Sequence, residues 1–108
     1  MNNTENNPTE RVQEDKYVMI PSTAFKKDKK RLSNQPKKLT KVEDTLNLLK
    51  KGGVDEIPKK MKPHQLIGEY NGFLECHIEP DLLLIWKQIE EDNIIFLDRL
   101  GSHAELFG

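Results

Sequence analysis

The sequence has very little cysteine: Cys76 is the only one among 108 residues, so no disulfide can form within the chain. A single cysteine fits a reducing compartment. Long apolar runs are also missing, since the longest, Leu82–Trp86, is far shorter than the roughly 20 residues of a membrane-spanning helix. The first eight residues have no basic start and no apolar stretch, so we expect no signal peptide. These absences predict a soluble cytoplasmic protein with no membrane partner.

Apolar residues make up only 35% of the chain, which allows one modest core and one small domain. Charge is abundant, and the net value of -1 conceals its segregation. Residues 1–15 carry one basic residue against four acids, residues 16–62 fourteen against five, and residues 63–108 two against nine. We predict a disordered, acidic, Asn-rich tail over residues 1–15 and a single domain over residues 16–108. The basic middle part should attract phosphate, although solvated lysine-rich helices would look the same.

Strand and helix signals begin at Tyr17. The segment Tyr17–Ile20 predicts a short strand, and Ser22 or Thr23 is expected to cap a helix that runs to about Leu32. A second helix is predicted by apolar residues at helical spacing, with two glycines as its stop: Leu39, Val42, Leu46 and Leu49, then Gly52-Gly53. Residues 54–63 are expected to form a loop.

The second half of the sequence predicts short strands, over residues 66–70, 73–78, 82–89 and 94–99. Turn residues separate them: Asn71-Gly72, Glu79-Pro80 and residues 90–93. The expected order is therefore βααββββ. This order predicts an α+β fold in which two N-terminal helices pack on a mainly antiparallel sheet of four to five strands.

All three histidines lie after residue 63, and imidazole can gain or lose a proton near neutral pH. His64 lies in the loop that enters the sheet region. His77 falls near a strand end and Asp81 begins the next strand, so these two are expected at one edge of the sheet. Arg99 ends the last predicted strand, and His103 follows it. Whether His64 and His103 reach the same edge depends on strand order, which the sequence leaves open.

Each of these residues also has a simpler interpretation. His77 alternates with Glu75 along a strand and could be an ordinary half-exposed residue. Asp81 is a natural turn residue, and Arg99 can pair with Asp98 or another surface acid for little energy. Three histidines and one aspartate could bind zinc, but their spacing matches no compact ligand motif. We therefore predict no metal and no other cofactor.

Three stretches occur together in one order: "STAFKKDKKRL", "HQLIGEYNGFLECHIEPDLLLIW" and the terminal "RLGSHAELFG". They contain His-x3-Gly, Gly-[FY]-x-x-x-His-[IV]-x-Pro-Asp and Arg-x-Gly-[ST]-His-x-x-Leu-Phe. Several unusual motifs over roughly ninety residues argue against chance. From Tyr17 to Gly108 the chain resembles the YafQ branch of the RelE/ParE superfamily, the small toxins of bacterial type II toxin–antitoxin pairs. Two positions depart from the pattern, with Leu82 where relatives often have Trp and Gln65 where Pro usually follows the histidine.

The resemblance implies a RelE-like fold and a metal-independent endoribonuclease that cuts messenger RNA on the translating ribosome. Carried over position by position, the implied catalytic set is His64, His77, Asp81, Arg99, His103 and Phe107. The last strand would deliver Arg99 to the sheet edge, and Gly101 would let the backbone turn. His103 would then reach the scissile phosphate. Phe107 would pack against a nucleotide or pin the chain end in place.

In the implied reaction one group removes the proton of the RNA 2′-hydroxyl and another protonates the leaving 5′-oxygen. We expect His64 to be the base and His103 the acid, although the two labels can be exchanged without contradicting the sequence. Arg99 would neutralise charge on the phosphate. Asp81 and His77 would orient the RNA or tune their neighbours.

Ribosomal RNA binding is expected from the basic stretch of Lys26, Lys27, Lys29, Lys30, Arg31, Lys37, Lys38 and Lys41. The resemblance also implies a cognate antitoxin, an acidic or amphipathic segment that wraps the toxin and blocks its site. Two alternatives remain open at this point. One is a ParE-type protein that inhibits a topoisomerase by binding alone. The other is a degenerate toxin that keeps only antitoxin binding.

Overall fold

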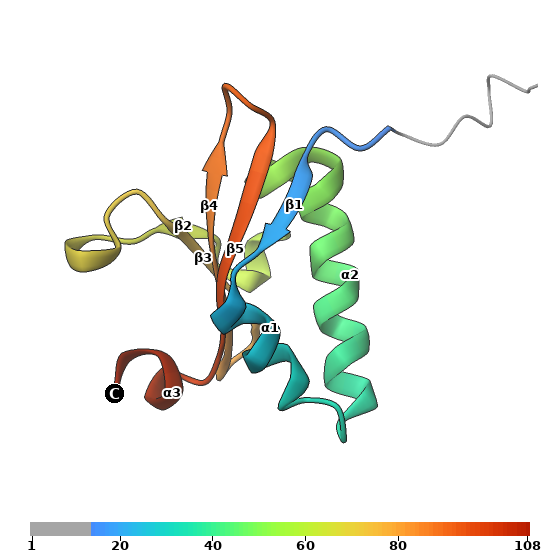
Figure 1. The fold of residues 1–108 in the computed structure, drawn as a ribbon, viewed down its shortest axis with the longest axis vertical. Coiled ribbons are helices and arrows are strands. Elements are labelled where there is room, and N and C mark those ends of the chain that lie inside the picture. Colours follow the sequence, from blue (N-terminus) through green and yellow to red (C-terminus); the bar gives the residue numbers. More distant parts are fainter. Residues whose placement is uncertain (1–13) are drawn as a thin grey trace, which may run out of the picture.

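The computed structural model describes residues 14–108 (Figure 1). The predicted tail over residues 1–15 therefore lies outside the described residues, except for Glu14 and Asp15, which are exposed. The elements follow in the order β1 (Val18–Pro21), α1 (Thr23–Lys30), α2 (Pro36–Gly52), β2 (His64–Gln65), β3 (Leu74–Glu79), β4 (Leu82–Ile89), β5 (Ile94–Gly101) and α3 (His103–Phe107). Short 3₁₀ helices span Gly53–Glu56, Lys59–Met61 and Gly68–Tyr70. None of the helices in this described part is long and apolar enough to cross a membrane.

One five-stranded sheet has the order β1-β5-β4-β3-β2. The pair of β1 with β5 is parallel, and the other three pairs are antiparallel. Helices α1 and α2 lie on one side of this sheet, whereas α3 and the segment between β2 and β3 lie on the other (Figure 1). The predicted α+β class, with two helices on a mainly antiparallel sheet, is confirmed.

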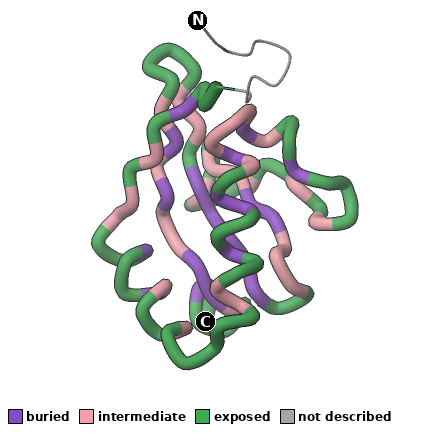
Figure 2. Tube along the Cα trace, turned by 90° about the vertical axis from the view of Figure 1, so that its right-hand side faces the viewer, coloured by how far each residue is buried: buried purple, intermediate pink, exposed green. Residues whose placement is uncertain are grey.

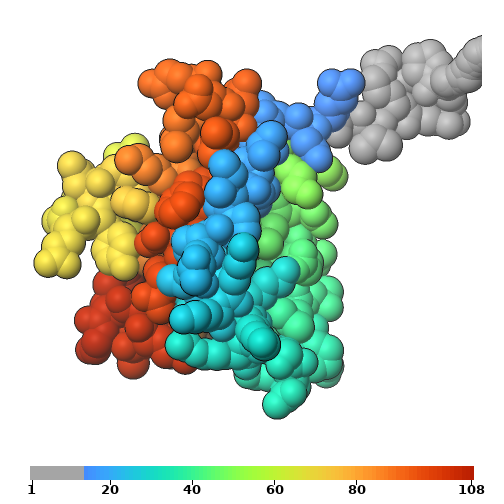
Figure 3. Space-filling view, in the orientation of Figure 1, coloured from blue at the N-terminus to red at the C-terminus, as the bar shows by residue number. Residues whose placement is uncertain are grey.

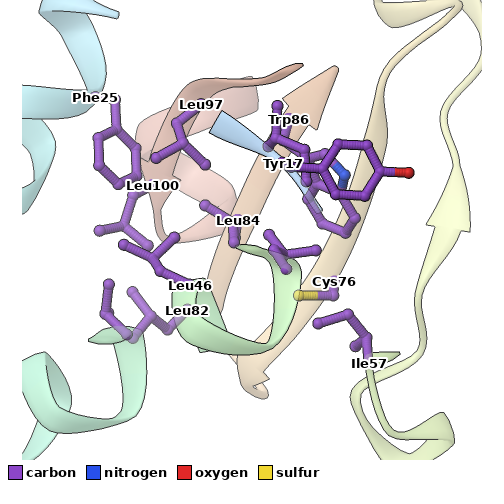
Figure 4. Packing of buried hydrophobic residues seen from close by; sticks show 13 residues of the cluster. Tyr17, Phe25, Leu46, Ile57, Cys76, Leu82, Leu84, Trp86, Leu97 and Leu100 are labelled. Atoms are coloured by element: carbon purple, nitrogen blue, oxygen red, sulfur yellow. The ribbon is translucent and has the colours of Figure 1, made fainter. Parts of the chain in front are cut away.

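Strand β4 explains how the two sides are held together. Its residues Leu82–Trp86 are all buried, which matches the uninterrupted apolar run in the sequence. Leu84 and Trp86 belong to the main core against α1 and α2 (Figure 4), whereas Leu83 and Ile85 belong to a smaller cluster with Leu106 of α3. Buried residues run along the central strands of the sheet (Figure 2). A strand with apolar contacts on both faces anchors α3 over the face that carries the histidines.

The N-terminal helix begins as predicted. The Ser22 hydroxyl accepts a hydrogen bond from the Phe25 N–H at 2.9 Å and so caps α1. Phe25 packs into the main core, while the basic residues of α1 stay at the surface. Helix α1 therefore presents Phe25 to the core and a basic exterior to the solvent.

The predicted strand over residues 66–70 is wrong. Pairing with β3 involves only His64 and Gln65, and the chain then turns into the 3₁₀ helix of Gly68–Tyr70. Gly68 has φ +73°, a left-handed conformation that ends any strand there, and Ile67 is 87% exposed. The Asn71-Gly72 turn does exist, because the Phe73 N–H donates to the Tyr70 carbonyl at 2.9 Å, but it joins this 3₁₀ helix to β3.

Helix α3 was not predicted, and it corrects the role given to Gly101. Gly101 is the last residue of β5 and is not among the residues with positive φ. A Cβ atom at Gly101 would lie 2.7 Å from Oε1 of Glu105 and 3.3 Å from Leu106. Ser102 caps α3, and Glu105 bonds back to the Ser102 N–H at 2.8 Å. Gly101 therefore permits the close approach of α3 and does not form a turn of its own.

Candidate active site

The sheet register places the predicted residues of three strands on one face. His64, Glu75, Ile85 and Arg99 are successive partners across β2, β3, β4 and β5. His77, Leu83 and Gly101 form the neighbouring row. Since adjacent strands lie about 4.8 Å apart, His77 is roughly 10 Å from Gly101, two residues before His103. This is the face opposite α1 and α2.

Two imidazoles of this face share one buried carboxylate. The Nε2 atom of His64 lies 3.3 Å from Oε1 of Glu75, and the Nε2 atom of His77 lies 3.8 Å from the same oxygen. The two rings are 6.3 Å apart between centroids. The Glu75 side chain is only 5% exposed, and its second oxygen, Oε2, is buried without a hydrogen-bond partner. Sequence reasoning missed Glu75, which had been noted only as a strand neighbour of His77.

The hydrogen bonds of His64 constrain its protons. Its Nδ1 lies 2.8 Å from the Lys62 carbonyl oxygen, which can only accept, so Nδ1 carries a hydrogen. The other ring nitrogen then faces the Glu75 carboxyl group. That contact is attractive only when a proton lies between the two groups. The His64 ring is therefore fixed at both of its nitrogens, by the Lys62 carbonyl group and by the Glu75 carboxyl group.

His103 is oriented from its backbone. Its N–H donates to Oδ1 of Asp81 at 2.9 Å, which joins the β3–β4 turn to the start of α3. The His103 ring lies 5.4 Å from that of Phe107, and Phe107 lies 5.6 Å from Tyr70. Phe107 is 44% exposed, so it retains a free surface. The segment between β2 and β3 and helix α3 accordingly lie side by side (Figure 3).

Arg99 is held by a carboxylate from α1. Its Nε and Nη2 atoms donate to Asp28 at 2.8 and 3.2 Å, and the Leu100 N–H donates to the same carboxylate at 2.9 Å. Arg31 adds a further contact to Asp28 at 3.2 Å. These hydrogen bonds raise the pKa of Arg99, so its guanidinium stays charged. The simpler interpretation, a weak pair with a surface acid, is wrong because the Asp28 side chain is only 2% exposed.

The predicted residues thus form two groups on one side of the sheet. His64 and His77 gather around Glu75, while Asp81, His103 and Phe107 gather around α3. Tyr70 contacts Phe107 of the second group and Phe73, and the small apolar cluster of Leu83 and Ile85 lies beneath. Imidazoles, aromatic rings and a fixed guanidinium are groups that suit a phosphodiester with unstacked bases.

The basic stretch is only partly free to meet phosphate. Lys29 pairs with Glu43, Arg31 pairs with Asp28, and both Lys38 and Lys41 pair with Glu79. The hydrogen bonds from Lys38 and Lys41 lower the pKa of Glu79. Within residues 14–108 the other members of the stretch make no ion pair with an acid: Lys26, Lys27, Lys30 and Lys37.

Two other kinds of chemistry find little support among the described residues. Residues 14–108 contain no group of three or more His, Cys, Asp or Glu side chains arranged to hold a metal ion. Burial raises the pKa of the Cys76 thiol to about 12, so it stays protonated at neutral pH and does not act as a nucleophile. Leu82 lies in the main core and adds nothing to the surface of the site.

Comparison with known proteins identifies the family. The family model described as "Bacterial toxin of type II toxin-antitoxin system, YafQ" matches residues 17–108. This chain belongs to the YafQ toxin family. The match begins at the strand β1 and includes every residue of the proposed site.

Individual YafQ relatives agree with this assignment. The "mRNA interferase toxin YafQ" of Escherichia coli K12 is 33% identical over 87 residues, which cover 81% of this chain and 91% of the relative. The crystal structure of YafQ from E. coli BL21(DE3) is 30% identical, with a TM-score of 0.76 over 85% of this chain and 99% of that one. The E. coli DinJ–YafQ complex contains a chain that is 32% identical, with a TM-score of 0.74 and the same coverage.

Proposed function

We propose that this YafQ-family toxin cleaves messenger RNA on the ribosome by acid–base catalysis with histidine side chains. It is an endoribonuclease of the mRNA interferase type, the activity that the names of its E. coli relatives carry. The observation that supports the mechanism best is the placement of His64, His77 and His103 over one face of the sheet. Two proton-transferring groups on opposite sides of a phosphate are what RNA transesterification requires.

The proposed reaction proceeds without a metal. Glu75 keeps the proton that lies between it and Nε2 of His64, so this nitrogen, with His77 beside it, takes the proton of the 2′-hydroxyl as the 2′-oxygen attacks the adjacent phosphorus. The bond from phosphorus to the 5′-oxygen breaks, and His103 donates a proton to that oxygen. The products are a 2′,3′-cyclic phosphate and a 5′-hydroxyl. Arg99 neutralises the charge that develops on the phosphate oxygens.

The other residues of the site position these groups. Asp81 fixes the backbone of His103 at the start of α3. Phe107 and Tyr70 offer ring faces on which an unstacked base can lie. Asp28 holds Arg99 in a defined orientation, and the N–H groups that Asp28 leaves unbonded remain available for phosphate.

The partners of this chain are an antitoxin protein and the ribosome. The E. coli YafQ relatives are known in complex with DinJ, an antitoxin, and the acidic or amphipathic chemistry expected of such a segment would complement the basic surface of α1 and α2. Lys26, Lys27, Lys30 and Lys37 would contact ribosomal RNA phosphates in a salt-dependent manner. A toxin that acts on translating ribosomes works in the cytoplasm.

The chemistry predicts the ends that cleavage leaves. Pure toxin added to ribosomes carrying a message should produce 2′,3′-cyclic phosphate and 5′-hydroxyl ends, at the same rate with metal-free toxin as with untreated toxin. The toxin is therefore stripped with EDTA and transferred to chelator-free buffer, so that the ribosomes keep their magnesium. Loss of activity in the stripped toxin, with recovery on adding a transition metal, would contradict the mechanism. A DNA-damage response in place of mRNA cleavage would favour the ParE-type alternative.

Replacing Glu75 should affect the cleavage rate and the stability of the fold differently. Its buried Oε2 has no partner, so a carboxylate at this position is costly to the fold. We expect Glu75→Gln to leave the free energy of unfolding unchanged or to raise it by up to about 1 kcal/mol. The same change should lower the cleavage rate about tenfold, because His64 and His77 lose the carboxylate that they share. Thermal unfolding and single-turnover cleavage measure the two effects, and a parallel loss of both would mean that Glu75 is mainly structural.

A further inference from the structure

Two hollows adjoin each other, and the first reaches His77 at the margin of the site described above. The first has a volume of about 320 Å³ and is lined by Lys60, Met61, Lys62, His77, Ile78, Glu79 and Pro80. The second, of about 340 Å³, is lined by Lys41, Asp44, Thr45, Leu48, Lys60, Met61 and Ile78. Because both share Lys60, Met61 and Ile78, they form one path from His77 to helix α2.

The path has the chemistry of a nucleotide site. Met61, Ile78 and Pro80 give the first hollow an apolar lining, and Lys60 and Lys62 are exposed beside them. Neither lysine pairs with an acid anywhere in residues 14–108. The acid of this hollow, Glu79, is already neutralised by lysines 38 and 41. The first hollow therefore combines apolar contact for a base with uncompensated positive charge for a phosphate, whereas the second also contains the carboxylate of Asp44.

The first hollow is also connected to the proton-transferring pair. Lys62 has φ +53°, a left-handed conformation that is uncommon for a residue with a long side chain. Lys62 lines the hollow, and its carbonyl oxygen accepts the hydrogen bond from Nδ1 of His64. The residue proposed to hold a phosphate is therefore joined by its backbone to the imidazole that acts on the neighbouring 2′-hydroxyl.

We propose that this path binds two successive nucleotides of the messenger RNA on one side of the scissile phosphate. Lys60 and Lys62 contact their phosphates, and Met61, Ile78 and Pro80 contact the bases. This inference rests on the proposed function, since it requires a single strand of RNA to cross the site at His77. It adds to that function a set of residues that select which nucleotide lies beside the cut.

The test compares Lys60→Glu and Met61→Ser with the matched control Lys59→Glu. Lys59 belongs to the same 3₁₀ helix as Lys60 but lines neither hollow. Single-turnover cleavage of ribosome-bound message is measured against toxin concentration, and the nucleotides flanking each cut are mapped. We expect Lys60→Glu to raise the half-saturating toxin concentration about tenfold, and Lys59→Glu to change it less than about twofold. Met61→Ser should alter the nucleotide preference on one side of the cut only.

The outcomes separate this inference from the proposed function. If wild-type toxin cleaves no message, both fall together. If it cleaves, and Lys60→Glu and Met61→Ser behave like the Lys59→Glu control, only the nucleotide path is overturned. The path is also overturned if Lys60→Glu weakens binding to ribosomes without a message, which would indicate ribosomal RNA. Weaker antitoxin binding with unchanged cleavage would instead assign the hollows to the antitoxin.

Discussion

Replacing His103 by alanine is expected to lower the single-turnover rate of mRNA cleavage by about 10²–10⁴-fold. The leaving 5′-oxygen is a poor leaving group until it receives a proton, and His103 is the imidazole at the exposed start of α3. Induction of the His103→Ala variant should therefore no longer arrest growth. The measurement is the rate of cleavage of ribosome-bound message at saturating toxin.

The fold should survive this change, which makes the result interpretable. His103 is exposed, and the hydrogen bond to Asp81 uses its backbone N–H, so alanine keeps that bond. Thermal unfolding and antitoxin binding of the His103→Ala protein should therefore match the wild type. Full toxicity in this variant would contradict the catalytic role, and a gyrase-inhibiting protein would be expected to show that behaviour.

The second large effect is expected on stability, from Asp28→Ala. Asp28 is buried and accepts hydrogen bonds from Arg99, Arg31 and the Leu100 N–H. Its removal leaves a partly buried guanidinium and a buried N–H without their partner. We expect a loss of about 3–5 kcal/mol in the free energy of unfolding, measured by urea denaturation.

Asp44→Ala is the matched control for this prediction. Asp44 is an exposed carboxylate on α2 with no ion pair among residues 14–108, so its loss should change stability by less than about 0.5 kcal/mol. Equal stability of the two variants would show that the Asp28 cluster contributes little. If the Asp28→Ala protein folds, its cleavage rate should also fall, because Arg99 loses the carboxylate that orients it.

The regular elements could be predicted because their signals are local. The spacing of Val42, Leu46 and Leu49 marks the buried face of α2, and Ser22 marks the start of α1. The uninterrupted run Leu82–Trp86 indicated a strand but not its two buried faces. Those faces depend on α3, whose five residues are too few to show a helical period. A capping box at Ser102 and Glu105 was the one signal that could have revealed it.

The failed strand over residues 66–70 has a similar cause. Leu66 and Tyr70 do contribute apolar contacts, but to the small cluster beneath α3. Gly68 in a left-handed conformation ends the strand, and a glycine in an alternating pattern is compatible with both a strand and a break. These distant contacts, together with that of Tyr70 with Phe107, explain why the segment folds over the sheet face.

Sequence motifs predicted some residues of the candidate site and missed others. They indicated His64, His77 and His103, which the strand register and the packing of α3 then place over one face, and their catalytic roles stay predictions. Glu75 and Asp28 escaped notice because a buried carboxylate looks like any other acid in a sequence rich in acids. Their importance depends on contacts between distant segments. Asp28 and Leu100, for example, lie more than 70 residues apart in the sequence.

The most direct test of the acid–base account is cleavage of a message whose 5′-oxygen at the cut is replaced by sulfur. A thiolate leaves without a proton, so this substrate needs no general acid. The account predicts that His103→Ala cleaves it within about tenfold of the wild-type rate, while the double variant His64→Ala/His77→Ala stays impaired. If His103→Ala remains as inactive on sulfur as on oxygen, His103 does not supply the leaving group's proton, and the central claim is wrong.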